Sequence, residues 1–343
     1  MAKIVRMKDI GEKLGVSTVT VSKAFSGQKG VSEKLRAEIL KTAQEMGYEP
    51  PASRKERTGI SYNIGVLIAS RYLDKSSSFY GQMLQHVTTE ASGRNCFTML
   101  ETITDEMESE CMQPQCIKSG NIDGIILIGY LAEHYLETIE SICSLPMIYL
   151  DFSGNMRGRD CIISDSFYGA YQLTNYLCDN GHREIAYVGT VLSTSSITDR
   201  YLGYMKAMME HHCEIRPEWI IDDRRTDNGL IDPEHLLQLP EQLPTAFFCN
   251  CDLAASHLLR KLEARGVNCP SDVSIVGYDN FTYDEFSDVS FTTYEVDMKE
   301  MSRKAVSNLI HKLNGEYYRR GVIIIAGKMI EKGSVKARAS TSL

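Results

Sequence analysis

The sequence predicts an all-α helix-turn-helix head joined to an α/β core of two doubly wound lobes. Short amphipathic helices fill the first 48 residues, a stretch with two prolines and a charge run follows, and apolar strands then alternate with helices in two successive series. We therefore expect a head over residues 1–48, a linker over 49–61 and a core over 62–343.

The head begins with two short helices inside residues 7–26. A Gly15-Val16 turn separates them, and the Ser17 hydroxyl can cap the free N–H groups that begin the second helix. Small residues and one cation lie on the outer face of that second helix, as expected of a helix that enters the major groove of DNA. The inner pairs at i, i+4 spacing are Ile10 with Leu14 and Val21 with Phe25; the outer face holds Thr18, Val19, Ser22 and Lys23.

A third helix, capped by Ser32 and ended by Gly47, is expected to close the core of the head. An ordinary helical hairpin in an all-α domain is the alternative for residues 7–26. The third helix and the charge of the head favour DNA binding over that alternative. The expected core positions of the third helix are Leu35, Ile39, Leu40, Ala43 and Met46.

The distribution of charge and the spacing of the cysteines limit the class of protein. Residues 1–58 hold 12 Lys and Arg against 7 Asp and Glu, whereas the remaining residues hold 25 against 38, so a basic head precedes an acidic body. No apolar run approaches the length of a membrane span, and no secretory h-region begins the chain. The 10 cysteines are scattered without a CxxC pair. We therefore expect a cytoplasmic protein with reduced thiols and no membrane contact.

The core begins with residues 64–69, a strand that is apolar on both faces, followed by a helix near 79–94. Alternation of this kind predicts parallel sheets covered on both sides, in two lobes whose strand ends face a shared crevice. Further strands are expected near 96–101, 123–128, 146–151, 185–189, 246–250 and 273–277, and helices near 200–212 and 252–265.

Polar residues follow several of these strands. Asp151, Asp252 and Asp279 each come directly after an apolar strand, and Arg200 is expected to begin a helix. Carboxylates and a forked guanidinium suit the hydroxyls of a sugar or another polar metabolite. The alternative is that each Asp caps the next helix, and Asp252 fits that alternative best.

Signals for enzyme chemistry are weak. The chain contains no GxGxxG, Walker A or GxSxG motif, so no cofactor, metal or catalytic residue is predicted. His182 lies in a helix-to-strand turn, where a structural hydrogen bond is expected. The Arg224-Arg225 pair is expected in a solvated loop, with the cleft as the alternative.

In its sequence motifs the chain resembles the lac repressor family (LacI/GalR type) over nearly its whole length. The resemblance implies a helix-turn-helix head, a hinge and a periplasmic-binding-protein-like core that dimerises and binds a small effector. We place an N-lobe at about 62–162 plus 293–322 and a C-lobe at about 163–292 plus 323–343. The matching motifs are Leu14-Gly15-Val16-Ser17, Thr20-Val21-Ser22-Lys23-Ala24, Gly181-His182-Arg183, Arg200-x-x-Gly203-Tyr204 and Pro270-x-Asp272-Val273-Ser274-Ile275-Val276-Gly277-Tyr278-Asp279-Asn280.

The resemblance also implies roles for individual residues. Thr18, Val19 and Lys23 match positions that contact base edges. Phosphate contacts are implied for Ser17, Thr20, Ser22 and Ser32, with Arg54 and Arg57 added from the hinge. The matching effector-binding positions are Phe79, Tyr80, Asp151, Arg200, Cys251 and Asp279.

Two departures from the family pattern affect these expectations. Glu56 stands where an apolar wedge usually enters the minor groove, and a carboxylate there is repelled by phosphates. Cys251 replaces an amide that would bind an effector hydroxyl, and Asn250 is expected to point to the other side of the strand. We therefore expect the effector to be held differently from the sugars of related repressors.

Together these features predict a homodimeric transcription regulator, a repressor, located in the cytoplasm at the nucleoid and not an enzyme. Its partners would be double-stranded operator DNA and a small-molecule effector, a carbohydrate. The alternatives are a solute-binding sensor whose head no longer binds DNA, and an enzyme that acts on sugars in the cleft through Asp151 and Asp279.

Overall fold

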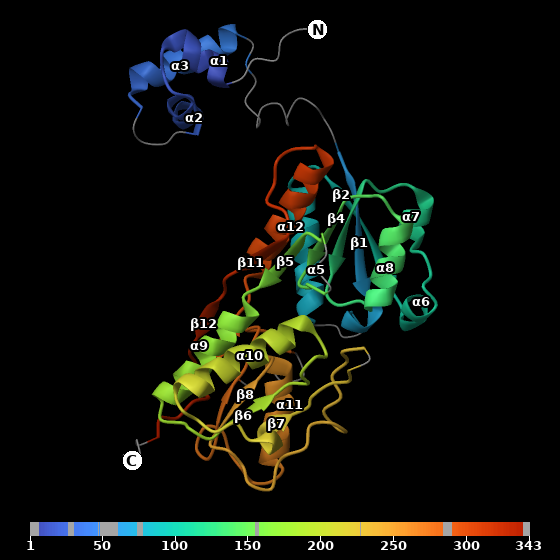
Figure 1. Cartoon of the computed structure of the whole chain (residues 1–343), viewed down its shortest axis with the longest axis vertical. Helices are drawn as coiled ribbons and strands as arrows, with labels where there is room; N and C mark the ends of the chain where they lie inside the picture. Colours follow the sequence, from blue (N-terminus) through green and yellow to red (C-terminus); the bar gives the residue numbers. More distant parts are fainter. Residues whose placement is uncertain are drawn as a thin grey trace. The chain divides into compact units, whose positions relative to one another are not determined.

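A computed structural model shows the chain as two compact units, Met1–Ser61 and Tyr62–Leu343 (Figure 1). The division falls where the sequence predicts the core to begin, and of the predicted linker over 49–61 all but Ser61 lies outside the described residues. The described residues are 7–26, 31–46, 48, 61–73, 78–154, 158–226, 228–283 and 290–338.

Unit 1 is a three-helix head made of α1 (Met7–Leu14), α2 (Thr18–Ser26) and α3 (Glu33–Glu45). The turn between α1 and α2 places Gly15 at a φ of 66°, which favours glycine. The predicted cap is confirmed, because the Ser17 Oγ accepts a hydrogen bond from the Thr20 N–H at 3.1 Å. The buried core consists of Ile10, Val21, Ala24, Ile39 and Ala43.

One core expectation for the head is wrong. Leu40 is 41% exposed, whereas its neighbour Ile39 is fully buried. Two adjacent positions of a helix differ by about 100° in direction, so α3 turns only one of this pair inward.

The N-lobe of unit 2 is a six-stranded parallel sheet in the order β11-β5-β4-β3-β1-β2. Helices α5 (Phe79–Ser92) and α12 (Met298–Leu313) pack on one face, and α7 (Gln115–Ser119) and α8 (Glu133–Ile142) on the other. A 3-10 turn (Ser70–Tyr72) and α6 (Asp105–Ser109) follow β1 and β2. The strands are β1 (Asn63–Ala69), β2 (Phe97–Ile103), β3 (Gly124–Ile128), β4 (Met147–Leu150), β5 (Cys161–Ser164) and β11 (Val322–Ile325).

The C-lobe is a four-stranded parallel sheet in the order β7-β6-β8-β9. Helices α9 (Ser166–Asp179) and α10 (Ser195–Glu210) cover one face, and α11 (Asp252–Glu263) covers the other. A 3-10 turn (Pro217–Trp219) precedes β7. The strands are β6 (Ile185–Val188), β7 (Ile220–Ile221), β8 (Ala246–Cys249) and β9 (Ser274–Val276).

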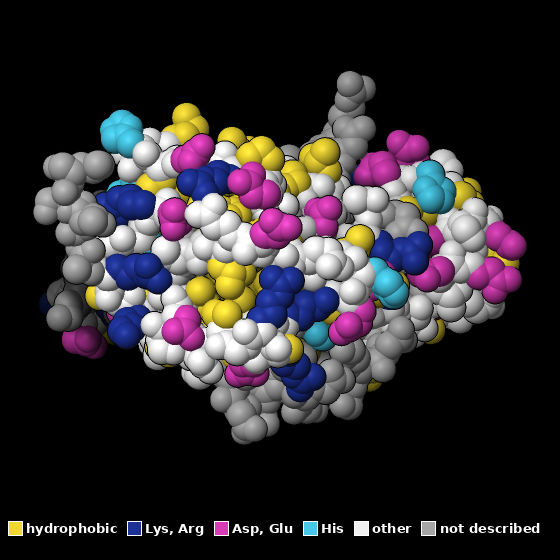
Figure 2. Space-filling view, turned by 90° about the horizontal axis from the view of Figure 1, so that it is seen from below, with side chains coloured by type: hydrophobic (Ala, Val, Ile, Leu, Met, Phe, Trp, Pro, Cys, Tyr) yellow, Lys and Arg dark blue, Asp and Glu magenta, His cyan; other side chains and the backbone are white. Residues whose placement is uncertain are grey.

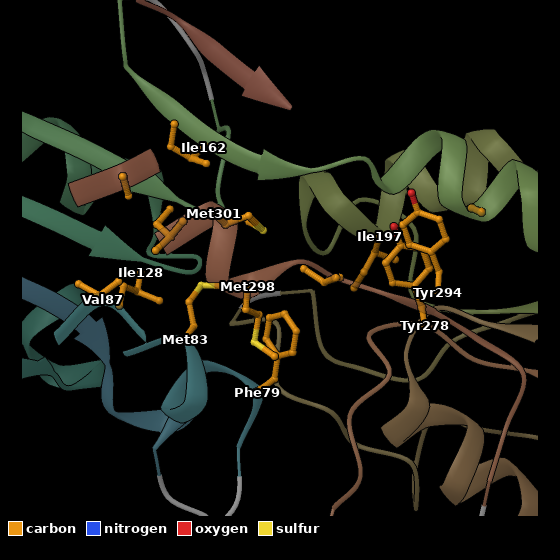
Figure 3. Close-up of a cluster of buried hydrophobic side chains, with 14 of the residues drawn as sticks. Phe79, Met83, Val87, Ile128, Ile162, Ile197, Tyr278, Tyr294, Met298 and Met301 are labelled. Carbon is orange, nitrogen blue, oxygen red and sulfur yellow. The ribbon is translucent and has the colours of Figure 1, made fainter. Parts of the chain in front are cut away.

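The two lobes are joined by three passages of the chain. The first is at Asp165, between β5 and α9; the other two run through β10 (Thr293–Glu295) and β12 (Lys328–Ile330), which pair antiparallel. A single cluster of buried residues extends across the junction. Figure 3 shows Met83, Ile128 and Met301 of the N-lobe in the same cluster as Ile197 and Tyr278 of the C-lobe.

Several element boundaries differ from those expected. α10 begins at Ser195, so Arg200 lies in the second turn of this helix and does not begin it. The Thr194 hydroxyl, which accepts from the Ile197 N–H at 3.3 Å, sets the earlier start. β5 and β11 carry the N-lobe sheet to Ser164 and Ile325, slightly beyond the expected lobe ends.

The surface of unit 2 mixes charges of both signs. On the face shown in Figure 2, acidic and basic side chains lie next to each other between small apolar patches. Among the described residues, no helix has both the length and the apolar character that crossing a bilayer requires.

Candidate DNA-contacting helix and interlobe site

The outer face of α2 is exposed as predicted. Val19 is 63% exposed, Thr18 and Ser22 are also exposed, and Lys23 is half-buried. An exposed β-branched residue on a short helix has no packing role within the head, so this face is available to a partner.

The hydroxyl residues implied as phosphate contacts also organise the helix starts. Ser17 Oγ lies 2.9 Å from Thr20 Oγ1 in addition to capping α2. Ser32 Oγ accepts from the Leu35 N–H at 3.3 Å and so caps α3. Helix starts present N–H groups that attract phosphate. The hinge residues Arg54, Glu56 and Arg57 lie outside the described residues.

Four polar side chains meet where the lobes face each other. Tyr80, in the first turn of α5, donates from its hydroxyl to Asp151 Oδ2 at 3.0 Å on the N-lobe side. On the C-lobe side, Arg200 Nη2 donates to Asp279 Oδ1 at 3.2 Å. Arg200 Nη1 donates to the carbonyl oxygen of Asn250 at 2.5 Å, and the guanidinium lies 3.8 Å from the centre of the Tyr278 ring.

The two carboxylates of this interlobe site sit on unusual backbone. Asp151 has a φ of 59° and Asp279 a φ of 98°, both in the region that favours glycine. A non-glycine residue there costs on the order of 1–3 kcal/mol, and such strain concentrates at binding and catalytic sites. The fold therefore holds both carboxylates in place at a cost in stability.

Burial and neighbouring charges control the ionisation of these groups. Burial, with a smaller contribution from Asp279, raises the pKa of Asp151 to about 6, although Arg200 and the Tyr80 hydroxyl oppose that rise. Burial also raises the pKa of Asp279, against Arg200 and Arg224. The Asp151 carboxyl of the N-lobe thus interacts with Arg200 and Asp279 of the C-lobe, which brings three predicted effector residues together.

Cys251 belongs to a second polar group beside the first. Arg224 Nη2 donates to Cys251 Sγ at 3.4 Å and to Asn250 Oδ1 at 3.0 Å, and it pairs with the fully buried Asp223 at 2.7 Å. Asn250 Nδ2 also donates to Asp223 Oδ2 at 2.7 Å. We expected the Asn250 side chain to point to the opposite side of the strand from Cys251. This expectation is wrong, because both side chains contact the Arg224 guanidinium.

Sequence reasoning missed Asp223 and gave the cleft only as the alternative for Arg224. The run Asp222-Asp223-Arg224-Arg225 predicts a solvated loop, yet the Arg224 side chain is only 16% exposed. The sequence signal that could have identified Asp223 is its position just after a strand. Asp223 comes two residues after β7, as Asp279 follows β9.

The neighbouring aromatic residues Phe79 and Tyr80 have different surroundings. Phe79 is 7% exposed and packs edge-on against Phe281 of the C-lobe, with ring centres 6.2 Å apart. Tyr80 stays half-buried and packs on Tyr72 at 4.4 Å. Ser153 Oγ donates to Ser195 Oγ at 3.3 Å, a further contact between the lobes. The lobes are therefore in contact around the interlobe site.

The alternative role for Asp252, capping α11, is wrong. Cys251 takes that position, and its Sγ accepts from the Ala254 N–H at 3.4 Å. Asp252 Oδ2 accepts from the Phe281 N–H at 3.0 Å and the Thr293 hydroxyl at 3.2 Å, while Oδ1 is buried without a hydrogen-bond partner in the described structure. Burial, with Asp279 nearby, raises the pKa of Asp252 to about 8, so the carboxyl is protonated at neutral pH.

This protonation predicts a pH dependence of stability. The pKa of Asp252 in the folded state lies above its value of about 3.9 in an unfolded chain. The stabilisation that the protonated carboxyl gives the folded state is therefore complete below about pH 3.9 and is lost as pH rises through about 8. We expect the native chain to lose up to about 1 kcal/mol per pH unit over this window relative to Asp252→Asn, which mimics the protonated group. Urea unfolding from pH 4.5 to 8.5 measures the difference; parallel pH profiles would contradict it.

His182 is structural, as expected. It is 1% exposed, with Nδ1 3.0 Å from Thr245 Oγ1 and Nε2 3.2 Å from the Lys336 carbonyl oxygen. Burial lowers its pKa to about 4. Among the described residues, no group of three or more His, Cys, Asp or Glu side chains is arranged to hold a metal ion.

Comparisons with known proteins agree with this architecture. The family described as "Bacterial regulatory proteins, lacI family" matches residues 6–51, and the "Periplasmic binding protein-like domain" matches residues 174–335. The HTH-type transcriptional repressor PurR of Pasteurella multocida is 26% identical over 340 residues, covering 97% of this chain and 99% of that protein. PurR of Actinobacillus pleuropneumoniae is 28% identical over 311 residues, covering 90% of each.

Solved structures show the same fold. A complex of the transcriptional regulator CelR with cellobiose has a TM-score of 0.67 at 20% identity and covers 96% of this chain and 99% of its own. The lac repressor dimer bound to operator and the anti-inducer ONPF has a TM-score of 0.63 at 20% identity and covers 98% and 100%. With a three-helix head, a two-lobed core and both family matches in chain order, this protein belongs to the lacI family of bacterial regulatory proteins, which are DNA-binding transcriptional regulators.

Proposed function

We propose that this regulator is a homodimeric repressor that binds a near-palindromic operator and changes its DNA affinity when a small polar effector binds between the lobes. The observation that carries the effector part is the interlobe site, where Asp151 faces Arg200 and Asp279 across the junction. An effector can shift DNA affinity only by binding one lobe arrangement better than another. A site made by both lobes meets that requirement.

The chemistry of the interlobe site supports a carbohydrate effector. Carboxylates accept hydrogen bonds from hydroxyls, and a guanidinium donates to them in a fixed fork. Arg200 Nε is buried and has no hydrogen-bond partner among the described residues, so a donor remains for a ligand oxygen. Structural neighbours include complexes with cellobiose and with D-xylulofuranose. Tyr80, Cys251 and Phe79 complete the proposed contacts.

In the head, Thr18, Val19 and Lys23 are proposed to contact base edges in the major groove. Ser17, Thr20, Ser22 and Ser32, with Arg54 and Arg57 of the linker, would contact phosphates and set the position of the head. Support comes from the exposure of α2 and from the net positive charge of residues 1–58. We place the protein in the cytoplasm at the nucleoid, acting as a binding protein and not as an enzyme.

Selection from random duplex DNA tests this function directly. The full chain should enrich a site with two-fold symmetry, and a panel of sugars and sugar phosphates should contain one that both raises the melting temperature of unit 2 and changes operator affinity. Absence of a symmetric site would overturn the DNA part. Turnover of a bound sugar would overturn the binding-protein part in favour of an enzyme.

Replacing Lys23 with alanine is expected to weaken operator binding by about 1–3 kcal/mol, roughly 5- to 150-fold. Lys41→Ala, an exposed cation on α3, is the matched control and should change affinity much less. Binding titrations against the selected operator and a scrambled duplex separate the contacts. A loss on the operator alone indicates base contact, a uniform loss indicates phosphate contact, and equal effects of both variants would contradict a role for α2.

A further inference from the structure

One loop of the N-lobe, residues 314–321, begins where the linker enters unit 2; we call it the entry loop. The strands of the N-lobe sheet are parallel, so all of them begin at one edge, and β1 begins there directly after Tyr62. The Tyr62 hydroxyl donates to Asn314 Oδ1 at 2.6 Å, at the end of α12. From there the entry loop leads to β11, on the far side of β3, β4 and β5 (Figure 1). It therefore follows the edge at which the strands begin, whereas Asp151 of the interlobe site follows the end of a strand.

Contacts at both ends attach the entry loop to the N-lobe. Gly315, with a φ of 63°, turns the chain out of α12. At the other end, Asp160 accepts from the Tyr318 hydroxyl and from the Gly321 N–H, both at 2.8 Å. Lys312 Nζ donates to the same carboxylate at 2.9 Å. The side chains between these contacts are thus presented from a supported backbone.

Three side chains of the entry loop face solvent. Tyr317 is 94% exposed, so its ring has no packing role within the core. Arg319 and Arg320 are exposed as well, and in the described parts of the chain neither guanidinium forms a salt bridge; Arg320 lies over the ring of Tyr318 at 5.8 Å. The loop sequence holds one acid, Glu316, against these two cations. The entry loop therefore presents two unneutralised cations beside a free phenol hydroxyl.

DNA phosphates are the partner that these groups and their position favour. Arginine and tyrosine side chains both donate hydrogen bonds to phosphate oxygens in protein–DNA complexes. The linker that ends beside the entry loop is itself basic, with three cations and one acid over residues 54–57. Fully extended, residues 49–61 span at most about 45 Å, so DNA held by the head stays close to the edge at which the linker ends.

We propose that Tyr317, Arg319 and Arg320 form a second DNA-contacting surface, on unit 2, which binds backbone phosphates of the duplex that the head recognises. This proposal rests on DNA binding by the head and extends it to the core. Phosphate contacts carry no base information, so the entry loop adds affinity without adding sequence preference.

The salt dependence of operator binding by the full chain tests this surface. Arg319→Ala/Arg320→Ala should bind more weakly than the native chain at about 50 mM salt, and the difference should shrink about ten-fold by about 200 mM. The reason is that each lost phosphate contact lowers the slope of log affinity against log salt by about 0.9. Arg319→Lys/Arg320→Lys keeps both charges and should keep the slope. Lys261→Ala/Arg265→Ala, which removes two cations on α11 and just after it, is the matched control and should bind like the native chain.

Ethylation interference locates the contacts on the DNA. Some phosphates should weaken binding of the native chain when ethylated but not binding of the double alanine variant, and Tyr317→Phe, which removes only the hydroxyl, should lose part of the same set. Equal salt slopes and identical interference patterns for the native chain and the double alanine variant would overturn the proposal. An equal slope with a changed oligomeric state in sedimentation would also overturn it, in favour of a second copy of the chain as the partner. A native chain that binds no duplex contradicts the function of the head as well, whereas native and variant chains that bind alike contradict only the role of the entry loop.

Discussion

Replacing Arg200 with alanine should lower the free energy of unfolding of unit 2 by about 3–5 kcal/mol and abolish its response to effector. The guanidinium is 6% exposed and is the ion-pair partner of Asp279. Its removal leaves Asp151 and Asp279 buried near each other, with the Asn250 carbonyl oxygen short of a donor. The large effect follows from that uncompensated charge more than from the lost attraction.

Urea unfolding of the full chain, followed by the single tryptophan in unit 2, measures this change. Arg303→Ala is the matched control, because Arg303 pairs with Glu300 on the surface and its side chain is 44% exposed; its cost should stay below about 1 kcal/mol. Arg200→Lys keeps the charge but loses the fork, and should fall between these limits. An Arg200→Ala chain as stable as the native one would show that Arg200 does not compensate the two carboxylates.

The second large effect is expected from Gly203→Ala, at about 3 kcal/mol of unfolding free energy. The new Cβ would lie 2.2 Å from the Phe167 carbonyl oxygen and 3.0 Å from Ala170 Cβ. Because the nearest atom belongs to the backbone of α9, relief requires the two helices to separate. The same separation would move Arg200, three residues earlier on α10, so effector affinity should fall with stability.

Gly93→Ala is the control for this steric argument. Gly93 follows α5 with a φ of −61°, and its added Cβ would make only ordinary contacts, the nearest at 3.5 Å. That variant should be neutral or slightly stabilising, since alanine restricts the unfolded chain. Thermal unfolding of both variants at one pH compares them directly. If the Gly203→Ala chain had the same melting temperature as the Gly93→Ala chain, α9 and α10 would not be in backbone contact.

The sequence predicted the elements with strong local signals. The Gly15 turn, the Ser17 cap and the apolar strand at 64–69 all appear where expected, because turn chemistry and burial are encoded within a few residues. The start of α10 was placed too late, since Ser195 and Ser196 mimic a loop while Thr194 supplies the cap. Polar residues in a first helical turn conceal such a boundary.

The interlobe site was predictable only in part. Asp151 and Asp279 were identified because each follows a strand, and parallel strands bring such ends together; Arg200 was identified as an expected helix start and through the family resemblance. Arg224 was expected in a solvated loop, with the cleft only as the alternative, because the residues that bury it are distant in sequence: Asn250 and Cys251 follow β8, and no pattern around residue 224 reveals them. Long-range contacts of this kind have no local signal.

The three passages between the lobes also have a consequence for how the chain is made. The N-lobe sheet ends at β11, so the outer edge of β5 stays unpaired until residue 325 has left the ribosome. The C-lobe waits equally long, because the Ser334 hydroxyl bonds Ile275 and Thr292 at 2.6 and 2.8 Å. Neither lobe is a contiguous stretch that folds while the other is being synthesised. The nascent chain therefore exposes an apolar strand edge until β11 has been synthesised, which makes it a natural client for chaperones.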